Sequence, residues 1–334
     1  MHLNTRTCVP HPEPRFLLAP MEGLLDARLR EVITCMGRYD WCVTEFVRVT
    51  NSVLPTRCYT RIAPELRNGS RAAAGTPVRV QLLGSDPASM AANAAHLAAL
   101  DPAGIDLNFG CPAPIVNRHG GGAILLDDPM QLNRVVSAVT RAVEGRVPVT
   151  AKMRLGVRDK SPALEAAHAL CDAGAQTLVV HARTKLEGYR APAHWQWIAR
   201  IAQAVSVPVI GNGEIWTVDD YLRCRAESGQ HDVMLGRGAV ADPFLVERIR
   251  DHLAGRRVGT PQADWARLRP FIDHYWQLVR SHVSPKHAPG RLKLWLNLLR
   301  RNYPQAETLF AQVKPIRDAQ VIDLHLQSNT DIAA

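Results

Sequence analysis

Eight short apolar runs recur along the first 240 residues, and each is followed by a stretch of helical character. Most runs are continuously apolar rather than alternating, as expected for parallel strands that are covered on both faces. A strand and a helix repeated eight times favour a (β/α)₈ TIM barrel. A doubly wound sheet is the alternative, but no G-x-G-x-x-G follows the first run. The predicted strands are 16–21, 41–47, 78–84, 104–110, 147–156, 177–183, 207–215 and 232–240.

The pattern changes at about residue 255, where helical spacing replaces the strand-and-helix alternation. One apolar stripe at positions i, i+3, i+4 and i+7 is formed by Leu292, Trp295, Leu296 and Leu299. A polar stripe at the same helical spacing is formed by Lys293, Asn297 and Arg300. The sequence therefore predicts a short N-terminal extension, a barrel and a small helical domain, with boundaries 1–15, 16–254 and 255–334.

The composition is that of an ordinary globular protein, with 46% apolar and 21% charged residues. No apolar run approaches the length of a membrane span, and the N-terminus lacks the apolar core of a signal peptide. We therefore expect a cytoplasmic protein. The seven cysteines include no C-x-x-C pair, so neither a zinc site nor an iron–sulfur cluster is predicted.

The formal net charge of +9 is concentrated near the C-terminus. Residues 255–317 hold twelve Lys or Arg against three Asp or Glu, so the rest of the chain is close to neutral. A basic module on a neutral body indicates a polyanionic partner, and nucleic acid is the leading candidate.

Polar residues stand where most of the predicted strands end, which in a TIM barrel is where the active site forms. Burying them without partners would be costly, so their convergence favours a functional site. The strand-end candidates are Met21, Glu45, Gln81, Asn108, Cys111, Lys152, His181, Asn212, Gly236 and Arg237.

Two glycine-rich turns, "GNGEI" and "LGRGA", follow the seventh and eighth strands, where barrels commonly bind a phosphate. Arg237 in the second turn could add a charged fork. Lys152 at a barrel mouth would pair with an anion, for which the N1–C2 edge of a reduced flavin is suited. Gln81 and Asn108 could bind the edge of a planar ring or be satisfied structural residues. His181 could also be structural, but it stands near Arg183, Lys185 and Arg190, a cluster suited to phosphates or a ring carbonyl.

The motifs resemble those of the tRNA-dihydrouridine synthases, a family of FMN-dependent enzymes that reduce a uridine in tRNA. The resemblance covers residues 16–318 and rests on "LAPMEG", "VQLLG", "DLNFGCP", "AKMRLG", "VVHART", "GNGEI" and "MLGRGA". Two further segments, "TEFVRVTNSVLP" and "GRLKLWLNLLRRNYPQAETLF", resemble the C branch of the family, which modifies position 16 of the D-loop. About a dozen extra residues before the first strand depart from the family pattern.

The resemblance implies a set of cofactor-binding residues and one catalytic acid, Cys111, with Asn108 near the target base. The implied FMN-binding residues are Pro20, Met21, Gln81, Lys152, His181, Asn212, Gly213, Glu214, Gly236 and Arg237. In this chemistry hydride goes from reduced FMN to C6 of the uracil, and a proton must then reach C5. A thiol is largely protonated at neutral pH and can donate that proton. Nucleophilic attack by Cys111 is the rival role and would require a nearby base.

A folded RNA substrate needs phosphate contacts as well as a pocket for one base. The predicted tRNA contacts, besides Asn108, are Arg48, Tyr189, Arg190, Arg291, Lys293 and Lys314. NADPH or NADH is the expected reductant, no membrane partner is expected, and a monomer is the simplest assembly. Two other functions stay open: an FMN-dependent reductase of a free pyrimidine or enone, and a tRNA-binding protein without catalysis.

Overall fold

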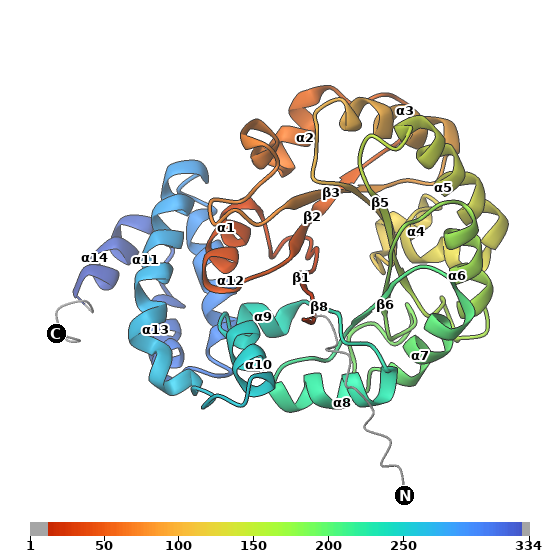
Figure 1. The fold of residues 1–334 in the computed structure, drawn as a ribbon. Helices are drawn as coiled ribbons and strands as arrows, with labels where there is room; N and C mark the ends of the chain where they lie inside the picture. Colours follow the sequence, from red (N-terminus) through yellow and green to blue (C-terminus); the bar gives the residue numbers. More distant parts are fainter. Residues whose placement is uncertain (1–12, 329–334) are drawn as a thin grey trace, which may run out of the picture.

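A computed structural model describes residues 13–328, and it confirms the predicted barrel. Eight parallel strands close in sequence order, because β1 pairs with both β2 and β8 (Figure 1). The predicted extension 1–15 lies almost wholly outside the described residues. The strands are β1 Phe16–Leu18, β2 Trp41–Arg48, β3 Val78–Leu83, β4 Ile105–Phe109, β5 Val149–Arg154, β6 Leu178–His181, β7 Val209–Asn212 and β8 Val233–Leu235.

Helices surround the barrel and continue beyond it on one side (Figure 1). Those of the barrel are α1 Ala27–Met36, α2 Thr56–Ile62, α3 Pro87–Ala98, α4 Pro114–Arg118, α5 Pro129–Val143, α6 Ala163–Asp172, α7 Trp195–Ala204, α8 Val218–Ser228, α9 Arg237–Ala241 and α10 Leu245–Leu253. The C-terminal helices are α11 Trp265–His282, α12 Ala288–Leu299, α13 Pro304–Val313 and α14 Ala319–Ser328, and short 3₁₀ turns occupy Pro64–Asn68, Gly122–Asp127 and Pro261–Asp264. No helix among residues 13–328 is long and apolar enough to cross a membrane.

Every strand except β2 is shorter than the sequence indicates, and the last two show the physical reason. Residues Arg237–Ala241, at the end of the predicted run 232–240, form helix α9 instead. Strand β7 ends at Asn212, because the next residue, Gly213, has φ +113° and leaves the strand conformation. Apolar composition alone does not distinguish a buried strand from the short buried helix that follows it.

The barrel interior contains two kinds of residues in successive layers. The lower layer is apolar and includes Leu17, Trp41, Val43, Val179, Ile210 and Met234. Arg79 lies over the Trp41 ring at 4.1 Å. Above this layer the inward positions are polar, and they lead to the carboxyl ends of the strands. The apolar layer thus supports a polar floor, on which a ligand site can be built.

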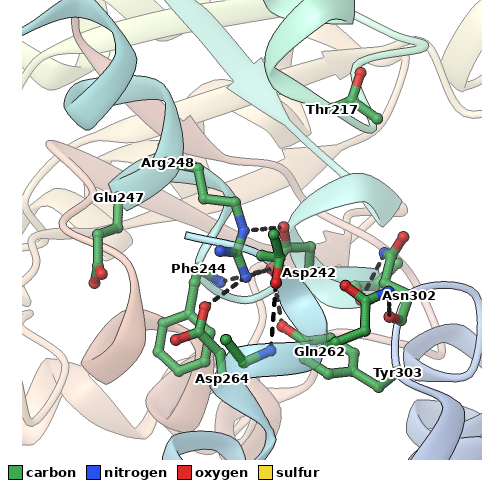
Figure 2. A network of polar contacts seen from close by, with 12 residues as sticks. Thr217, Asp242, Phe244, Glu247, Arg248, Gln262, Asp264, Asn302 and Tyr303 are labelled. Atoms are coloured by element: carbon green, nitrogen blue, oxygen red, sulfur yellow. Dashed lines mark hydrogen bonds and ion pairs between the residues drawn. The ribbon is translucent and has the colours of Figure 1, made fainter. Parts of the chain in front are cut away.

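The C-terminal helices are fixed to the barrel through α9 and α10. Arg248 of α10 bridges Asp242 and Asp264, with N–O distances of 2.8 Å and 2.7 Å (Figure 2). The Tyr303 hydroxyl donates to the same Asp242 carboxylate at 3.0 Å. Trp295 of α12 donates its indole N–H to the Val240 carbonyl at 3.1 Å. These buried polar contacts join the helix that follows β8 to the start of α11 and the end of α12.

Candidate functional site

A cavity of about 1050 Å³ opens at the carboxyl ends of the strands. All ten residues implied to bind FMN line it, together with Cys111, Asn108, Arg48 and Tyr189. These residues come from all eight strands or the loops that follow them, so the strand-end reasoning located a real convergence. A second cavity, of about 440 Å³, lies between α1, α10 and the start of α11 and contains none of the predicted residues.

Cys111 lies in a turn that hydrogen bonds hold on several sides. The Asn108 side-chain oxygen accepts from the backbone N–H groups of Gly110, at 3.0 Å, and Cys111, at 2.9 Å. Asn117 donates its side-chain amide to the Cys111 carbonyl at 2.9 Å. Arg154 donates Nε–H to the Gly110 carbonyl at 2.8 Å. The turn therefore presents the thiol at the cavity wall in one defined position.

The Cys111 thiol is kept protonated by its surroundings. Burial raises the pKa of Cys111 above its ordinary value, and the nearby Glu22 carboxylate raises it further, against an opposing effect of Arg154. A nucleophilic cysteine needs the opposite shift, because the thiolate is the attacking species. The environment of Cys111 therefore favours a proton donor over a nucleophile.

Lys152 is the only lysine among the described residues that line the cavity. Its ammonium group donates to the Asn212 side-chain oxygen at 2.8 Å, and Asn212 donates in turn to the Met234 carbonyl at 2.7 Å. Burial and the positive charge of Arg154 lower the pKa of Lys152 to about 7, against the opposing effect of Asp106. An anion placed beside Lys152 would restore its charge.

Five cationic or potentially cationic groups line the cavity on the side of β5 to β8: Lys152, Arg154, His181, Arg183 and Arg237. Burial lowers the pKa of His181, and the positive charges of Arg154, Lys152, Arg183 and Arg237 lower it further, so the ring is neutral. Burial and two neighbouring arginines lower the pKa of Arg183 to about 10. Arg183 forms an ion pair with Glu214, and the Arg237 guanidinium lies over the rings of Tyr189 and Trp216 at 4.8 Å and 5.1 Å.

The two glycine-rich turns touch each other on this side of the cavity. A Cβ atom on Gly238 would lie 2.0 Å from the Ile215 carbonyl oxygen, and one on Gly213 would lie 2.7 Å from the His181 ring. Only glycine allows this close approach of the two backbones. The described residues that line the cavity include six lysines or arginines and three carboxylates, so the cavity has a net positive formal charge, and Arg237 belongs to one of the turns. This arrangement fits a phosphate group.

Two carboxylates line the cavity near β1 and β2: Glu22 in the β1–α1 loop and Glu45 on β2. Glu45 accepts from the Gly23 N–H at 2.6 Å. Burial raises the pKa of Glu22 and of Glu45, and mutual repulsion raises that of Glu22 further. Arg291 of α12 donates to the Gly23 carbonyl at 2.7 Å and forms an ion pair with Asp26. A helix from the C-terminal region thus holds the loop that contains Pro20 and Met21.

The predicted tRNA contacts occupy different environments. Tyr189 is 55% exposed at the cavity rim. Arg190 and Lys314 are exposed. Lys293 is half-buried and donates to the Ile316 carbonyl. The Arg291 guanidinium donates to the Gly23 carbonyl of the β1–α1 loop. Their contact with RNA stays a prediction.

Sequence reasoning missed several residues of the site. Arg154 stands inside the motif "AKMRLG" and has no predicted role, although a charged residue in an apolar strand is a usable signal; Arg183 was predicted only as a member of the cationic cluster beside His181. Trp216 follows a glycine turn and donates to Glu214 at 3.1 Å. Asp106 and Thr150 lie inside predicted strands, and nothing in the sequence indicates that they touch.

The comparisons with known proteins place the chain in one family. Residues 17–320 match the family model described as "Dihydrouridine synthase (Dus)". The chain is 56% identical over 308 residues to the tRNA-dihydrouridine(16) synthase of Ralstonia nicotianae, covering 92% of this chain and 94% of that protein. It is 53% identical over 308 residues to the enzyme of the same name from Aquipseudomonas alcaligenes, covering 92% and 96%.

The similarity to solved structures supports the fold and nothing more specific. Histamine dehydrogenase from Rhizobium sp. 4-9 superimposes with a TM-score of 0.54 at 15% identity, covering 79% of this chain and 49% of that one. A 2-naphthoyl-CoA reductase gives 0.53 at 11% identity, covering 72% and 50%. The family model and the close relatives extend over nearly the whole chain, and this protein therefore belongs to the dihydrouridine synthase family.

Proposed function

We propose that this protein is an FMN- and NADPH-dependent tRNA-dihydrouridine synthase that reduces uridine 16 in the D-loop. The close relatives named tRNA-dihydrouridine(16) synthase support the position. The observation that carries the reaction is a thiol, Cys111, whose raised pKa favours the protonated form, at the wall of a cavity that is cationic on the side of β5 to β8. The proposal includes a barrel domain over 16–254, a tRNA-binding helical domain over 255–334, and a monomeric, cytoplasmic enzyme.

The residues of the cavity fit FMN. The net positive charge of the cavity and the close backbone approach at the two glycine turns suit its phosphate, with Gly213, Glu214, Gly236 and Arg237 as the holding residues. Lys152 suits the electron-rich edge of the ring, because it is a buried hydrogen-bond donor of the cavity and an anionic edge beside it would favour its charged form. The remaining implied FMN-binding residues are Pro20, Met21, Gln81, His181 and Asn212. When bound, FMN supplies the hydride for C6 of the uracil.

The protein's own task is to deliver a proton to C5 and to stabilise charge on the uracil carbonyls. Cys111 donates the thiol proton, and the raised pKa keeps that proton in place until negative charge develops on the base. Asn108 and Arg154 hold the Cys111 turn, so the thiol approaches the base from a fixed direction. Lys152 and His181 offer hydrogen bonds at the floor of the same cavity.

The test is NADPH oxidation by the purified protein, with and without a tRNA that lacks dihydrouridine but is otherwise mature. We expect oxidation that tRNA stimulates and dihydrouridine that maps to position 16. NADH in a parallel series measures the nucleotide preference. Oxidation that is equal without tRNA and leaves no dihydrouridine would instead favour a reductase of free small molecules.

A further inference from the structure

A buried carboxylate beneath the cavity has no part in the mechanism above. Asp106 lies in the middle of β4 and is 1% exposed. Its register partners are Gln81 on β3 and Thr150 on β5, so the three residues lie side by side across neighbouring strands. Burying a carboxylate is costly unless it is paired and hydrogen-bonded, so its position needs an explanation.

A continuous chain of hydrogen bonds leads from Asp106 to the Cys111 turn. Thr150 donates its hydroxyl to one carboxylate oxygen of Asp106 at 2.6 Å. Gln81 donates its side-chain amide to the other oxygen at 2.7 Å. Asn108 donates its amide to the Gln81 side-chain oxygen at 2.7 Å, and the Asn108 oxygen accepts from the Gly110 and Cys111 N–H groups.

The chemistry of the two ends fixes the direction of every bond in this chain. Two backbone N–H groups face Asn108, and because both are donors they require its oxygen. The Asn108 NH₂ group must then face Gln81, which must present its own oxygen. The Gln81 NH₂ group consequently points to the next residue and needs an acceptor there. Asp106 is that acceptor; burial raises its pKa, against the opposing effects of the hydrogen bonds from Gln81 and Thr150 and of the charges of Lys152 and Arg79.

We propose that Asp106 is a positioning residue for Cys111, acting through the fixed amide orientations of Gln81 and Asn108. Without an acceptor at position 106, the Gln81 amide can turn over and present its NH₂ group to the NH₂ group of Asn108. The Asn108 oxygen is then drawn toward the Gln81 NH₂ group as well, its hydrogen bonds to the Gly110 and Cys111 N–H groups weaken, and the turn loosens. The catalytic meaning of this device rests on the proposed function, whereas the hydrogen-bond chain itself does not.

Two substitutions separate the acceptor from the charge. Asp106→Leu keeps the approximate size and removes the acceptor. Asp106→Asn removes the charge but keeps an acceptor, because its amide can turn its oxygen to Gln81 and its NH₂ group to the Thr150 hydroxyl. That hydroxyl already lies 3.5 Å from the Ile105 carbonyl and can donate there instead.

The first measurement is the rate of Cys111 alkylation by iodoacetamide in the full-length protein as purified, read at each cysteine by peptide mass spectrometry. In Asp106→Leu we expect alkylation at least about fivefold faster than in the wild type, because a loosened turn exposes the thiol. In Asp106→Asn we expect a rate within about twofold of the wild type. Equal rates in Asp106→Leu and the wild type would overturn the proposal, as would an equal rise in both variants.

The chain can also be broken one link further along, should the leucine variant fail to fold. Gln81→Met removes the middle amide at similar length, and the same rise in Cys111 alkylation is expected; no rise would contradict the proposal. Turnover gives a second measurement: in Asp106→Leu, kcat should fall about tenfold or more with an unchanged KM for tRNA. A higher KM for tRNA with an unchanged kcat would refute a positioning role. Dihydrouridine formation by the wild type tests the proposed function separately, since alkylation needs no turnover.

Discussion

The barrel mouth and the C-terminal helices both hold many cations, and their electrostatic situations are opposite. In the mouth, Arg154 and Arg183 are buried beside Lys152, and burial lowers the pKa of each. On the C-terminal helices the arginines mostly find carboxylates; Arg267, for example, contacts both Glu247 and Asp264, which raise its pKa. Buried cations that lie close together can form a selective anion site. Exposed cations that are paired with carboxylates contribute little to stability.

Ion pairing also reduces the positive charge that the C-terminal region can offer to a partner. Counted along the sequence, residues 255–317 carry nine surplus positive charges. In the folded protein several are neutralised by acids from the barrel, such as Glu247 opposite Arg267 and Asp26 opposite Arg291. The surface available to an RNA is therefore less positive than the local sequence indicates.

The largest expected effect concerns the thiol at the mouth. Cys111→Ala should lower the rate of dihydrouridine formation by about 10²–10⁴-fold, because the general acid is lost. Reduction of the flavin by NADPH, measured anaerobically without tRNA, should persist. Cys171→Ala, which replaces a half-buried cysteine on α6, serves as the control. Equal activity of Cys111→Ala and the control would exclude Cys111 as the proton donor.

The contact between the two glycine turns should be the next most sensitive feature. In Gly238→Ala the new Cβ meets the Ile215 carbonyl oxygen and forces the turns apart. Overpacking of this kind costs about 1–3 kcal/mol, so FMN affinity should fall by about fivefold to about 150-fold. Gly290→Ala is the matched control, since a Cβ there meets nothing within 4 Å. Equilibrium dialysis of the flavin measures both, and equal affinities would mean that the turns do not hold the phosphate.

The lowered pKa of Lys152 predicts a pH dependence of flavin binding. Below about pH 7 the lysine is charged in the free protein; above it the lysine is neutral and must take up a proton to pair with the flavin. FMN affinity should therefore be flat below this pH and fall as the pH rises above it, by up to about tenfold per unit. Lys152→Met should bind more weakly and lose this fall. A wild-type profile that parallels that of Lys152→Met would contradict the assignment.

Replacement of Arg291 should affect the barrel as well as the RNA surface. Arg291→Ala removes an ion-pair partner from the buried Asp26 and a donor from the Gly23 carbonyl, so we expect a loss of about 1–3 kcal/mol in stability. Urea denaturation at neutral pH measures this loss. Arg300→Ala, which breaks an exposed pair with Glu307, provides the comparison and should cost less than about 1 kcal/mol. Similar losses of stability in both variants would mean that the partly buried pair of Arg291 is worth no more than the exposed pair of Arg300.

The smallest effect is expected at Lys314, which is exposed on the C-terminal side. Lys314→Ala should weaken tRNA binding a few-fold and reduce the slope of log K against log salt by about 1, as one lost phosphate contact predicts. Flavin content should not change. The salt series is measured by filter binding with the same unmodified tRNA, and an unaltered slope would remove Lys314 from the RNA contacts.

The order of the strands and the membership of the cavity were predictable, because both follow from local pattern. Each apolar run marks a strand, and in a parallel barrel every strand end reaches the same face. The role of Asp106 was not predictable, because it depends on the register that sets β4 against β3 and β5. Arg291 and Asp26 are 265 residues apart, and no local pattern reveals their pairing. Sequence thus locates the residues of the site, whereas long-range partners decide what each one does.

The buried cluster around Arg248 also determines how the protein can meet a large substrate. Any hinge between barrel and C-terminal helices would have to separate Arg248 from Asp264 and Tyr303 from Asp242, leaving buried charges without partners. The barrel and the C-terminal helices therefore move as one rigid body, so the barrel mouth and the surface of these helices keep a fixed relative orientation. Under the proposed function, shape adaptation falls to the nucleic acid, whose loop must deform to bring one uridine into the barrel.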